Sequence, residues 1–342
     1  MQASFFDVED CYARLDRQDH LLKLNSVINW SGLAALMGQI SFEGKVDGRG
    51  RHPLDGLRMA KILILQACNS LSDEMAEFLI NDRLSFKRFL GLDVAEKSPD
   101  AKTIWLWRER IKHSGLHEKI FAWFEEELCN AGFAAQGGQI VDATFVPTHK
   151  PTGKHTKQMA AEIPLSARQS EQIDPDATFT KKRNESHHGY KNHVRIDARH
   201  KLIRAAETTT ASLHDSQKFE DMLAPASAQP EAEENAVYAD SAYRSTETEA
   251  NLAAAGLNSQ VHERAYKNKP LTPEQKAKNR EKSRIRVRVE HMFGHMNTAM
   301  HGLMIHTIGL ARAKVKVTFK NLAYNMQRFA FLMRQRQQHQ CA

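Results

Sequence analysis

The stretch QIVDATFVP, residues 139–147, predicts a short strand, because it is mostly apolar and β-branched and lies between a Gly-Gly pair and Pro147. Asp142 lies in the middle of this stretch. An ionised carboxylate that is buried in a sheet is strongly destabilising unless it is paired, hydrogen-bonded or bound to a cation. An Asp that bonds a turn or an Arg is the simpler explanation of Asp142 alone. However, a second carboxylate, Asp240, follows another predicted strand at 236–239.

The composition indicates an ordinary globular protein with two domains, or with one domain and an insertion. The chain has 342 residues, of which 41% are hydrophobic and 26% are charged. Its four cysteines are far apart and form no CxxC pair, so we expect neither a disulfide framework nor a zinc knuckle. An acidic start and the lack of a long apolar run predict a cytoplasmic protein that is neither secreted nor embedded in a membrane.

The net charge of +7 is unevenly distributed along the chain. Residues 1–135 carry a net charge of −3, and residues 136–342 carry +10. The segment 267–288 holds nine basic and two acidic residues, and no Asp or Glu occurs after position 290. A surface of one sign is typical of a protein that binds a polyanion such as DNA.

The first part of the chain has the spacing of helices. Apolar periodicity predicts helical segments within 5–40 and from Pro53, and capping residues predict further helix starts at Ser72 and Asp100. A last helix is expected over 116–131, ending at a glycine. This pattern fits a helix-turn-helix-like module, and it fits equally a plain bundle with Trp105 and Trp107 in its core.

The second part reads as α/β. We expect a long loop over 149–186, an antiparallel hairpin of strands 190–197 and 202–209, and a helix that opens at His214 or Asp215. After the strand at 236–239 we expect a helix over 246–255 and a short strand near 260–262. A long helix is predicted from near Thr272, and a basic amphipathic helix over 315–333 closes the chain.

Three carboxylates on separate elements, Asp142, Asp240 and Glu290, are what a two-metal phosphoryl-transfer site requires. In such sites two ions lie roughly 3.5 to 4 Å apart, and hard oxygen ligands favour Mg²⁺, with Mn²⁺ as a substitute. Simpler explanations exist for the second and third acids. Asp240 can cap the turn that follows it, and Glu290 can pair with Arg286 four residues earlier.

Three motifs carry a resemblance to a known family. IVDATFVPT, YADSAYRS and RVRVEHMFG resemble the first Asp, second Asp and Glu regions of the DDE insertion-sequence transposases. The chain is most similar to the family named after insertion sequence five, which is related to the group named after insertion sequence four. HPLDGLRMAKILILQACNSLSDEMAEFL, FLGLDVAEKSPDAKTIWLWRERI, HHGYKNHVRIDARHKLI and ASLHDSQ extend the resemblance over most of the chain.

This resemblance implies an N-terminal helical domain over 1–135, a candidate for binding DNA ends. It also implies an RNase H-like catalytic domain over 136–342, with a mixed sheet flanked by helices, an insertion before the Glu helix and a basic C-terminal helix. Asp142, Asp240 and Glu290 are then the metal ligands. Arg286 matches the Arg of the wider group's Tyr-Arg-Glu-Lys signature. The Tyr and Lys positions of that signature fall on Ser283 and Asn297, which departs from the pattern.

The implied reaction is metal-assisted hydrolysis at the ends of the element, followed by attack of the freed 3′-hydroxyl on target DNA. The implied partners are the terminal inverted repeats and the target DNA, and the implied assembly is a homodimer on DNA in a bacterial nucleoid. Candidate phosphate contacts are the basic side chains near the strands and helices of the second part: Lys191, His193, Arg284, Arg286, Arg288, Lys314, Lys316 and Lys320.

Three alternatives remain open at this point. An RNase H-like nuclease without strand transfer would use the same metal site. A non-catalytic DNA-binding relative would keep the fold and bind DNA without cleaving it. A zinc hydrolase is suggested by His291 and His295 beside Glu290, although a metalloprotease helix requires the Glu between the histidines. The group His187, His188 and His193 is another candidate for metal binding, but histidines in a basic segment more often lie in solvent or near phosphate.

Overall fold

The computed structural model describes residues 19–40, 54–153, 166–182, 184–226, 234–266 and 270–340. The chain forms two compact units, and each is described by itself. Unit 1 comprises Met1–Glu127 together with Leu322–Ala342, and unit 2 comprises Leu128–Asn321. The last helix, α14 (Leu310–Gln340), contributes its first part to unit 2 and its remainder to unit 1. In the described ranges every helix is too short or too polar to span a bilayer.

Unit 1 is built from helices. They are α2 (His20–Val27), α3 (Ser31–Met37), α4 (Gly56–Asn69), α5 (Asp73–Asp82), α6 (Leu84–Leu90), α7 (Ala101–Ser114) and the first part of α8 (Leu116–Asn130), with the later part of α14. In α4, consecutive residues from Met59 to Leu65 are all buried, including the Lys61 side chain. A helix that is covered on all sides occupies the centre of its bundle.

Side-chain caps set the helix starts. Ser72 accepts a hydrogen bond from the Met75 N–H and Asp100 accepts one from the Thr103 N–H, which confirms both predicted starts. The predicted first turn at Pro53 lies outside the described residues. α4 begins instead at Gly56, because the Asp55 carboxylate accepts the N–H groups of residues 57 and 58.

Two details of unit 1 differ from the sequence expectations. Helix α6 was not predicted, because its seven residues are too few for a periodic signal. Of the two tryptophans that the plain-bundle alternative places in the core, Trp107 is buried, but Trp105 is 43% exposed. The expected helical spacing within 5–18 falls outside the described residues.

Unit 2 contains a mixed sheet with six described strands. They are β1 (Gln139–Pro147), β2 (Thr178–Lys182), β3 (Glu185–Asp197), β4 (Ile203–Thr210), β5 (Ala236–Tyr238) and β6 (Asn258–Ser259). β3 pairs antiparallel with β1, β2 and β4, whereas β5 runs parallel to both β1 and β6. Three antiparallel strands followed by two parallel ones, in the order β4-β3-β1-β5-β6, form the RNase H-like arrangement.

The structure contains each predicted strand of unit 2, but the first and last residues of some strands differ from the prediction. The hairpin is β3 and β4, but β3 begins at Glu185, and β2 lies in the stretch that was predicted as a loop. That prediction was wrong because β2 is largely exposed and lacks an apolar face. The expected short strand near 260–262 is assigned to Asn258–Ser259, and its backbone hydrogen bonds continue to His262.

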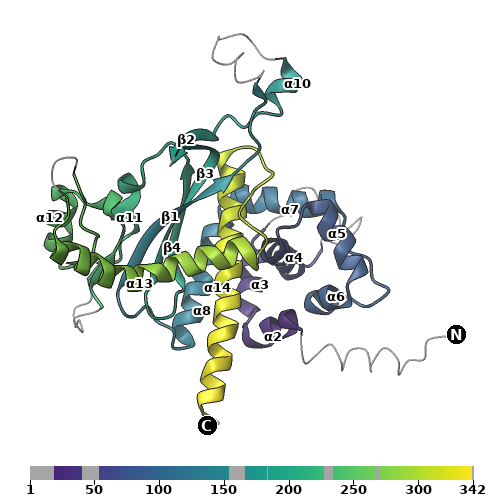
Figure 1. Cartoon of the computed structure of the whole chain (residues 1–342). Coiled ribbons are helices and arrows are strands. Elements are labelled where there is room, and N and C mark those ends of the chain that lie inside the picture. Colours follow the sequence, from purple (N-terminus) through teal and green to yellow (C-terminus); the bar gives the residue numbers. More distant parts are fainter. Residues whose placement is uncertain are drawn as a thin grey trace. The chain divides into compact units, whose positions relative to one another are not determined.

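Different helices cover the two faces of the sheet. Val141 packs with Phe219 of α11 (Phe219–Met222) and Leu252 of α12 (Thr246–Ala254), whereas Val146 packs with Val317 of α14. Alternate residues of a strand point to opposite faces, so these clusters lie on opposite sides of β1. Figure 1 shows α13 (Pro273–Thr298) running across the sheet. α13 begins after Thr272, as predicted, and the Thr272 side chain caps it by accepting the Gln275 N–H.

Gly189 gives a test of the β1–β3 pairing. It has φ +142°, and a Cβ added there would lie 2.3 Å from the Val146 carbonyl oxygen. We expect Gly189→Ala to destabilise unit 2 by at least about 2 kcal/mol, because both the backbone conformation and the close approach oppose a side chain. Thermal unfolding of the variant measures this loss.

Gly294→Ala is the matched control, since Gly294 lies within α13 and has no heavy atom within 4 Å of its added Cβ. It should stabilise the helix by about 0.5 to 1 kcal/mol. Equal melting temperatures for the Gly189 variant and the parent chain would contradict the proposed constraint.

Candidate active site

Asp142 lies in the middle of the central strand β1 and on the α13 side of the sheet. Its side chain is 18% exposed. One carboxylate oxygen accepts the Ala143 N–H at 2.8 Å, and the other accepts Nη1 of Arg286 at 3.1 Å. Burial raises the pKa of Asp142 to about 6, although the Ala143 N–H and Arg286 act against this shift. The pKa shows that even with its partners the ionised carboxylate is not fully compensated.

Asp240 lies beside Asp142 by strand register. Ile140 of β1 pairs with Tyr238 of the parallel strand β5, so two residues further along each strand bring Asp142 and Asp240 to neighbouring positions on one face. The Asp240 charge contributes to the raised pKa of Asp142. Asp240 also caps the short helix η2 (Ser241–Tyr243) by accepting the Ala242 N–H at 2.7 Å, so the simpler explanation of this residue holds as well.

Glu290 reaches the site through Arg286. On α13, Nη2 of Arg286 donates to Oε1 of Glu290 at 2.5 Å, the i, i+4 pair that the sequence suggests. The same guanidinium binds Asp142, so it bridges a strand and a helix. In the part of the chain that the structure describes, no three His, Cys, Asp or Glu side chains lie close enough together to hold a metal ion. The structure therefore brings Asp142 and Asp240 together, and the Arg286 guanidinium links Glu290 to Asp142.

The donor set nevertheless fits a divalent cation. Asp142 is a mostly buried carboxylate that already holds a positive group, which marks a place where a cation is stabilised. Tyr243 packs in the apolar cluster with Val141 and Phe219, and its buried hydroxyl has no hydrogen-bond partner among the described residues. Burial and the charges of Asp142, Asp215 and Asp240 raise the pKa of Tyr243, so its hydroxyl stays protonated and can donate. Carboxylate and hydroxyl oxygens suit Mg²⁺ or Mn²⁺.

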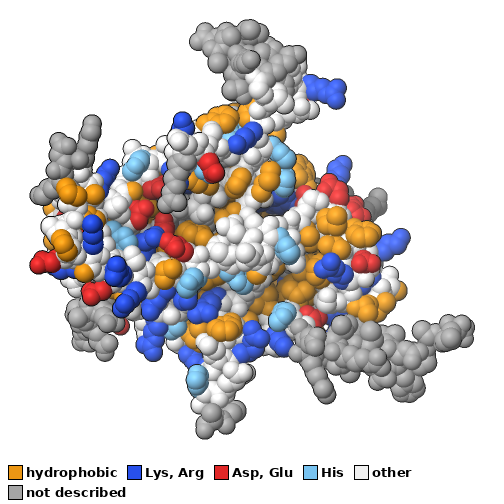
Figure 2. Space-filling model, in the orientation of Figure 1, with side chains coloured by type: hydrophobic (Ala, Val, Ile, Leu, Met, Phe, Trp, Pro, Cys, Tyr) orange, Lys and Arg blue, Asp and Glu red, His pale blue; other side chains and the backbone are white. Residues whose placement is uncertain are grey.

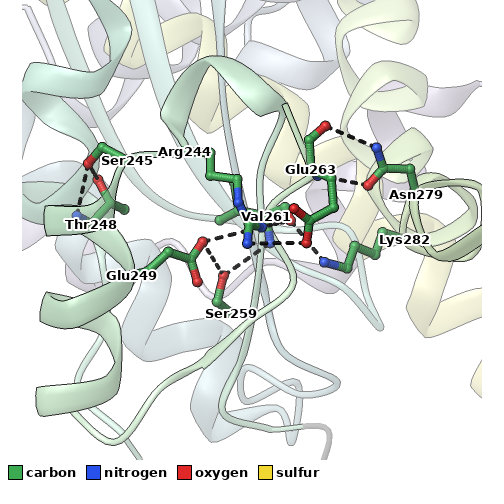
Figure 3. Close-up of polar contacts among 9 residues, drawn as sticks. All are labelled: Arg244, Ser245, Thr248, Glu249, Ser259, Val261, Glu263, Asn279 and Lys282. Carbon is green, nitrogen blue, oxygen red and sulfur yellow. Dashed lines mark hydrogen bonds and ion pairs between the residues drawn. The ribbon is translucent and has the colours of Figure 1, made fainter. Parts of the chain in front are cut away.

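A polar cluster around Arg244 fixes the segment that follows Asp240 (Figure 3). Nη1 of Arg244 donates to the Val261 carbonyl at 3.0 Å, and the guanidinium pairs with Glu249 at 3.4 Å and with Glu263 at 3.1 Å. Ser259 donates to Glu249 at 3.0 Å. These bonds tie the end of β5 to α12 and to the loop after β6.

The same loop holds the N-terminal half of α13. Lys282 donates to the Val261 carbonyl at 2.9 Å, and the Asn279 amide makes two bonds with the Glu263 backbone, at 2.8 and 3.1 Å. The elements that carry Asp240 and Glu290 are thus anchored to one short segment (Figure 3). Sequence reasoning missed Arg244, and its position within YADSAYRS, four residues after Asp240, was the available signal.

Three of the predicted phosphate contacts are buried inside unit 2. Lys191 donates to the Leu213 carbonyl and pairs with Asp215, His193 bonds Thr209, and Lys320 donates to the Met300 carbonyl. Their exposed fractions are 7%, 1% and 6%, so these side chains do not reach a DNA backbone in this conformation. The sequence could not separate them from surface cations, because a buried Lys and an exposed Lys look alike in a polar segment.

The other predicted contacts are more accessible. Arg284 on α13 is exposed, and Lys314 and Lys316 on α14 are half-buried. Arg288 is half-buried and donates to the Ala198 carbonyl at 2.6 Å. In Figure 2, Lys and Arg side chains gather along and beside α13.

A cavity of about 770 Å³ opens between β5, the β3–β4 turn and α13. Among the described residues, Arg199, Lys201 and Arg288 line it together with one carboxylate, Glu234. Gln136, Gly137, Tyr238 and Ile285 are its other described lining residues. Arg199 and Lys201 were not among the sequence candidates, because only the hairpin turn brings them beside α13.

The histidines of the zinc alternatives have other neighbours in the structure. The described ranges contain no group of three metal-ligating side chains, and Lys201 faces His291 instead, at 3.4 Å. The three histidines of the alternative cluster have other partners: His187 stacks on Phe145, His188 bonds Thr148, and His193 bonds Thr209.

Comparison with known proteins identifies the family of the chain. The family described as "Transposase DDE domain" matches residues 134–326, and "Transposase domain (DUF772)" matches residues 9–110. A solved structure, the cryo-EM structure of piggyBac transposase synaptic complex with hairpin DNA, is similar at 10% identity and a TM-score of 0.47. The alignment covers 90% of this chain and 74% of that chain. The match to the DDE domain spans more than half of the chain. The chain therefore belongs to the transposase DDE domain family and is a DNA transposase that uses divalent metal.

Proposed function

We propose that this transposase cleaves the ends of an insertion sequence and joins the freed 3′-hydroxyl ends to target DNA at a site formed by Asp142, Asp240 and Glu290. The observation that carries the proposal is a buried, cation-paired Asp142 that lies beside Asp240 by strand register. The motifs around the three acids further suggest the insertion-sequence-five family. The terminal inverted repeats and target DNA would be the substrates, and two ends to be joined favour a homodimer on DNA.

The three carboxylates would hold two Mg²⁺ ions, with Mn²⁺ as a substitute. When bound, such ions activate the attacking oxygen and stabilise the leaving one. Within the site, Asp142 is fixed by the Ala143 N–H and Asp240 by the Ala242 N–H, so each presents its second oxygen in a defined direction. The buried Tyr243 hydroxyl, whose pKa the charges of Asp142 and Asp240 raise, stays protonated and keeps a hydrogen bond to donate.

DNA would be held by phosphate contacts along α13 and at the cavity lined by Arg199, Lys201 and Arg288. Such contacts position the backbone without reading its sequence. Arg284 and the lysines at 314 and 316 are further candidates. Preference for the element's ends is assigned here to the helical domain, residues 1–135, and chemistry to residues 136–342.

The first prediction concerns the three acids. Asp142→Asn, Asp240→Asn and Glu290→Gln should each reduce cleavage and joining of labelled end DNA at least about 10²-fold, the scale of losing one electrostatic group in an active site. DNA affinity, measured by fluorescence anisotropy, should remain.

Glu247→Gln is the control for these variants, because Glu247 is an exposed carboxylate on α12. Its cleavage and joining should match the parent chain. Cleavage without joining in the parent chain would favour a nuclease, and full activity in any one of the three variants would remove that residue from the site.

The second prediction is a pH dependence of metal binding. Since the pKa of Asp142 is raised to about 6, this group is protonated below that value and ionised above it. A proton then competes with the cation, so Mn²⁺ affinity should fall roughly tenfold per pH unit below pH 6 and level off above about pH 7. Isothermal titration calorimetry between pH 5 and pH 8 measures this. An affinity that does not change between pH 5 and pH 6 would contradict metal binding by an Asp142 whose pKa is raised.

The third prediction concerns the basic cavity. The double substitution Arg199→Gln and Lys201→Gln should weaken binding to random and end DNA alike. If both side chains neutralise phosphates, the slope of log affinity against log salt should become shallower by about 1.8. Arg280→Gln, an exposed cation on α13 outside the cavity, is the comparison and should change the slope by less than one unit. An unchanged slope in the double variant would exclude the cavity from DNA binding.

A further inference from the structure

The Arg286 guanidinium occupies the position between the carboxylates at which a cation is needed. Nη1 lies 3.1 Å from Oδ2 of Asp142, and Nη2 lies 2.5 Å from Oε1 of Glu290. We propose that Arg286 is an internal counter-ion that stabilises the metal-free site and must leave these carboxylates before the metal binds. This inference rests on the proposed function of the three acids.

The geometry suits an arginine in this role. The guanidinium is planar and presents two N–H groups in a fixed fork, so one side chain can bind two carboxylates on different elements. Arg286 and Glu290 are one helical turn apart on α13, and Asp142 faces them from β1. A Lys ammonium is a point charge on a flexible stem and cannot reproduce this fixed fork.

Burial explains why the site needs such a group. Asp142 and Arg286 expose 18% and 19% of their side chains, whereas Glu290 exposes 52%. Without a cation, Asp142 would be a largely buried charge next to a second carboxylate, Asp240, which is strongly unfavourable. Arg286 removes part of that cost in the absence of metal, and for the same reason it competes with the metal.

The oxygen atoms involved make this competition direct. Asp142 has one oxygen bonded by the Ala143 N–H and the other by Arg286, and Glu290 turns Oε1 toward Arg286. A divalent ion bound through the same oxygens would be held within a few ångströms of the guanidinium, where like charges repel. Release of Arg286 frees Glu290 to turn toward Asp142 and Asp240, which completes a set of three acids that the present conformation does not bring together.

The test is Mn²⁺ binding to the full chain without DNA, measured by isothermal titration calorimetry at pH 8. Arg286→Gln should tighten the dissociation constant about tenfold, the scale of one charge-assisted hydrogen bond. Arg286→Lys keeps the charge but loses the fork, so it should tighten binding by an intermediate factor. Arg280→Gln removes a cation from an exposed position of the same helix and should stay within about twofold of the parent chain.

Thermal unfolding supplies a readout that does not depend on activity. In chelator, Arg286→Gln should melt below the parent chain, because Asp142 has lost its counter-ion. In saturating Mn²⁺ this difference should shrink or disappear, so the variant gains more from the metal than the parent does. An equal gain in both proteins would overturn the inference.

The outcomes separate this inference from the proposed function. If the parent chain binds no Mn²⁺, or if Asp142→Asn binds it equally well, the metal site itself is wrong. If the parent binds Mn²⁺ through Asp142 but Arg286→Gln binds no tighter, the site stands and the counter-ion role is rejected. If Arg286→Gln binds tighter while Arg286→Lys matches the parent, net charge alone explains the effect and the bridging role is rejected.

Discussion

A carboxylate in the middle of the central strand is the constraint on which unit 2 depends. The backbone of Asp142 is fixed in the sheet, because β1 pairs with β3 along its whole length and with β5 at Gln139 and Ile140. The sheet therefore holds the charge in place, and neighbouring groups must compensate it. A backbone N–H and Arg286 do so only in part, since the pKa of Asp142 remains raised to about 6. A residue that destabilises its own fold in this way is expected where binding energy for a cation is needed.

The two faces of the sheet divide core formation and charge between them. On one face, Val141 and Val237 pack against α11 and α12 as an ordinary apolar core. On the other face, the parallel register of β1 and β5 brings Asp142 and Asp240 together, and Tyr238 lines the basic cavity. Because strands alternate, one register fixes both arrangements. A one-residue shift in strand register would place Asp142 and Asp240 in the apolar core. The apolar packing on one face therefore also fixes the position of the two acids on the other face.

Much of this could be predicted from the sequence. The β-branched run with Asp142, the hairpin, the strand before Asp240 and the cap at Thr272 all have local signals, and the structure contains each of them. The exposed strand β2 and the short helix α6 have no such signal. Burial of the Lys191 and Lys320 ammonium groups was also invisible, because each is satisfied by a carbonyl far away in the chain. The cavity and the Arg286 bridge between Asp142 and Glu290 depend on how α13 packs on the sheet. The spacing of residues along the sequence does not predict this packing.

Helix α13 shows why the bridge forms where it does. Asn279 and Lys282 bind its first half to the loop after β6. These bonds fix both the position of the helix along its axis and its rotation about that axis. One turn further on, Ile285 and Arg288 line the basic cavity, while Arg286 points toward Asp142. At 100° per residue, 286 and 290 share one stripe and 288 lies on the far side of it. The helix can therefore keep its anchor and its basic surface while only the side chains of Arg286 and Glu290 exchange partners. That separation allows a metal-free resting site without any rearrangement of the fold.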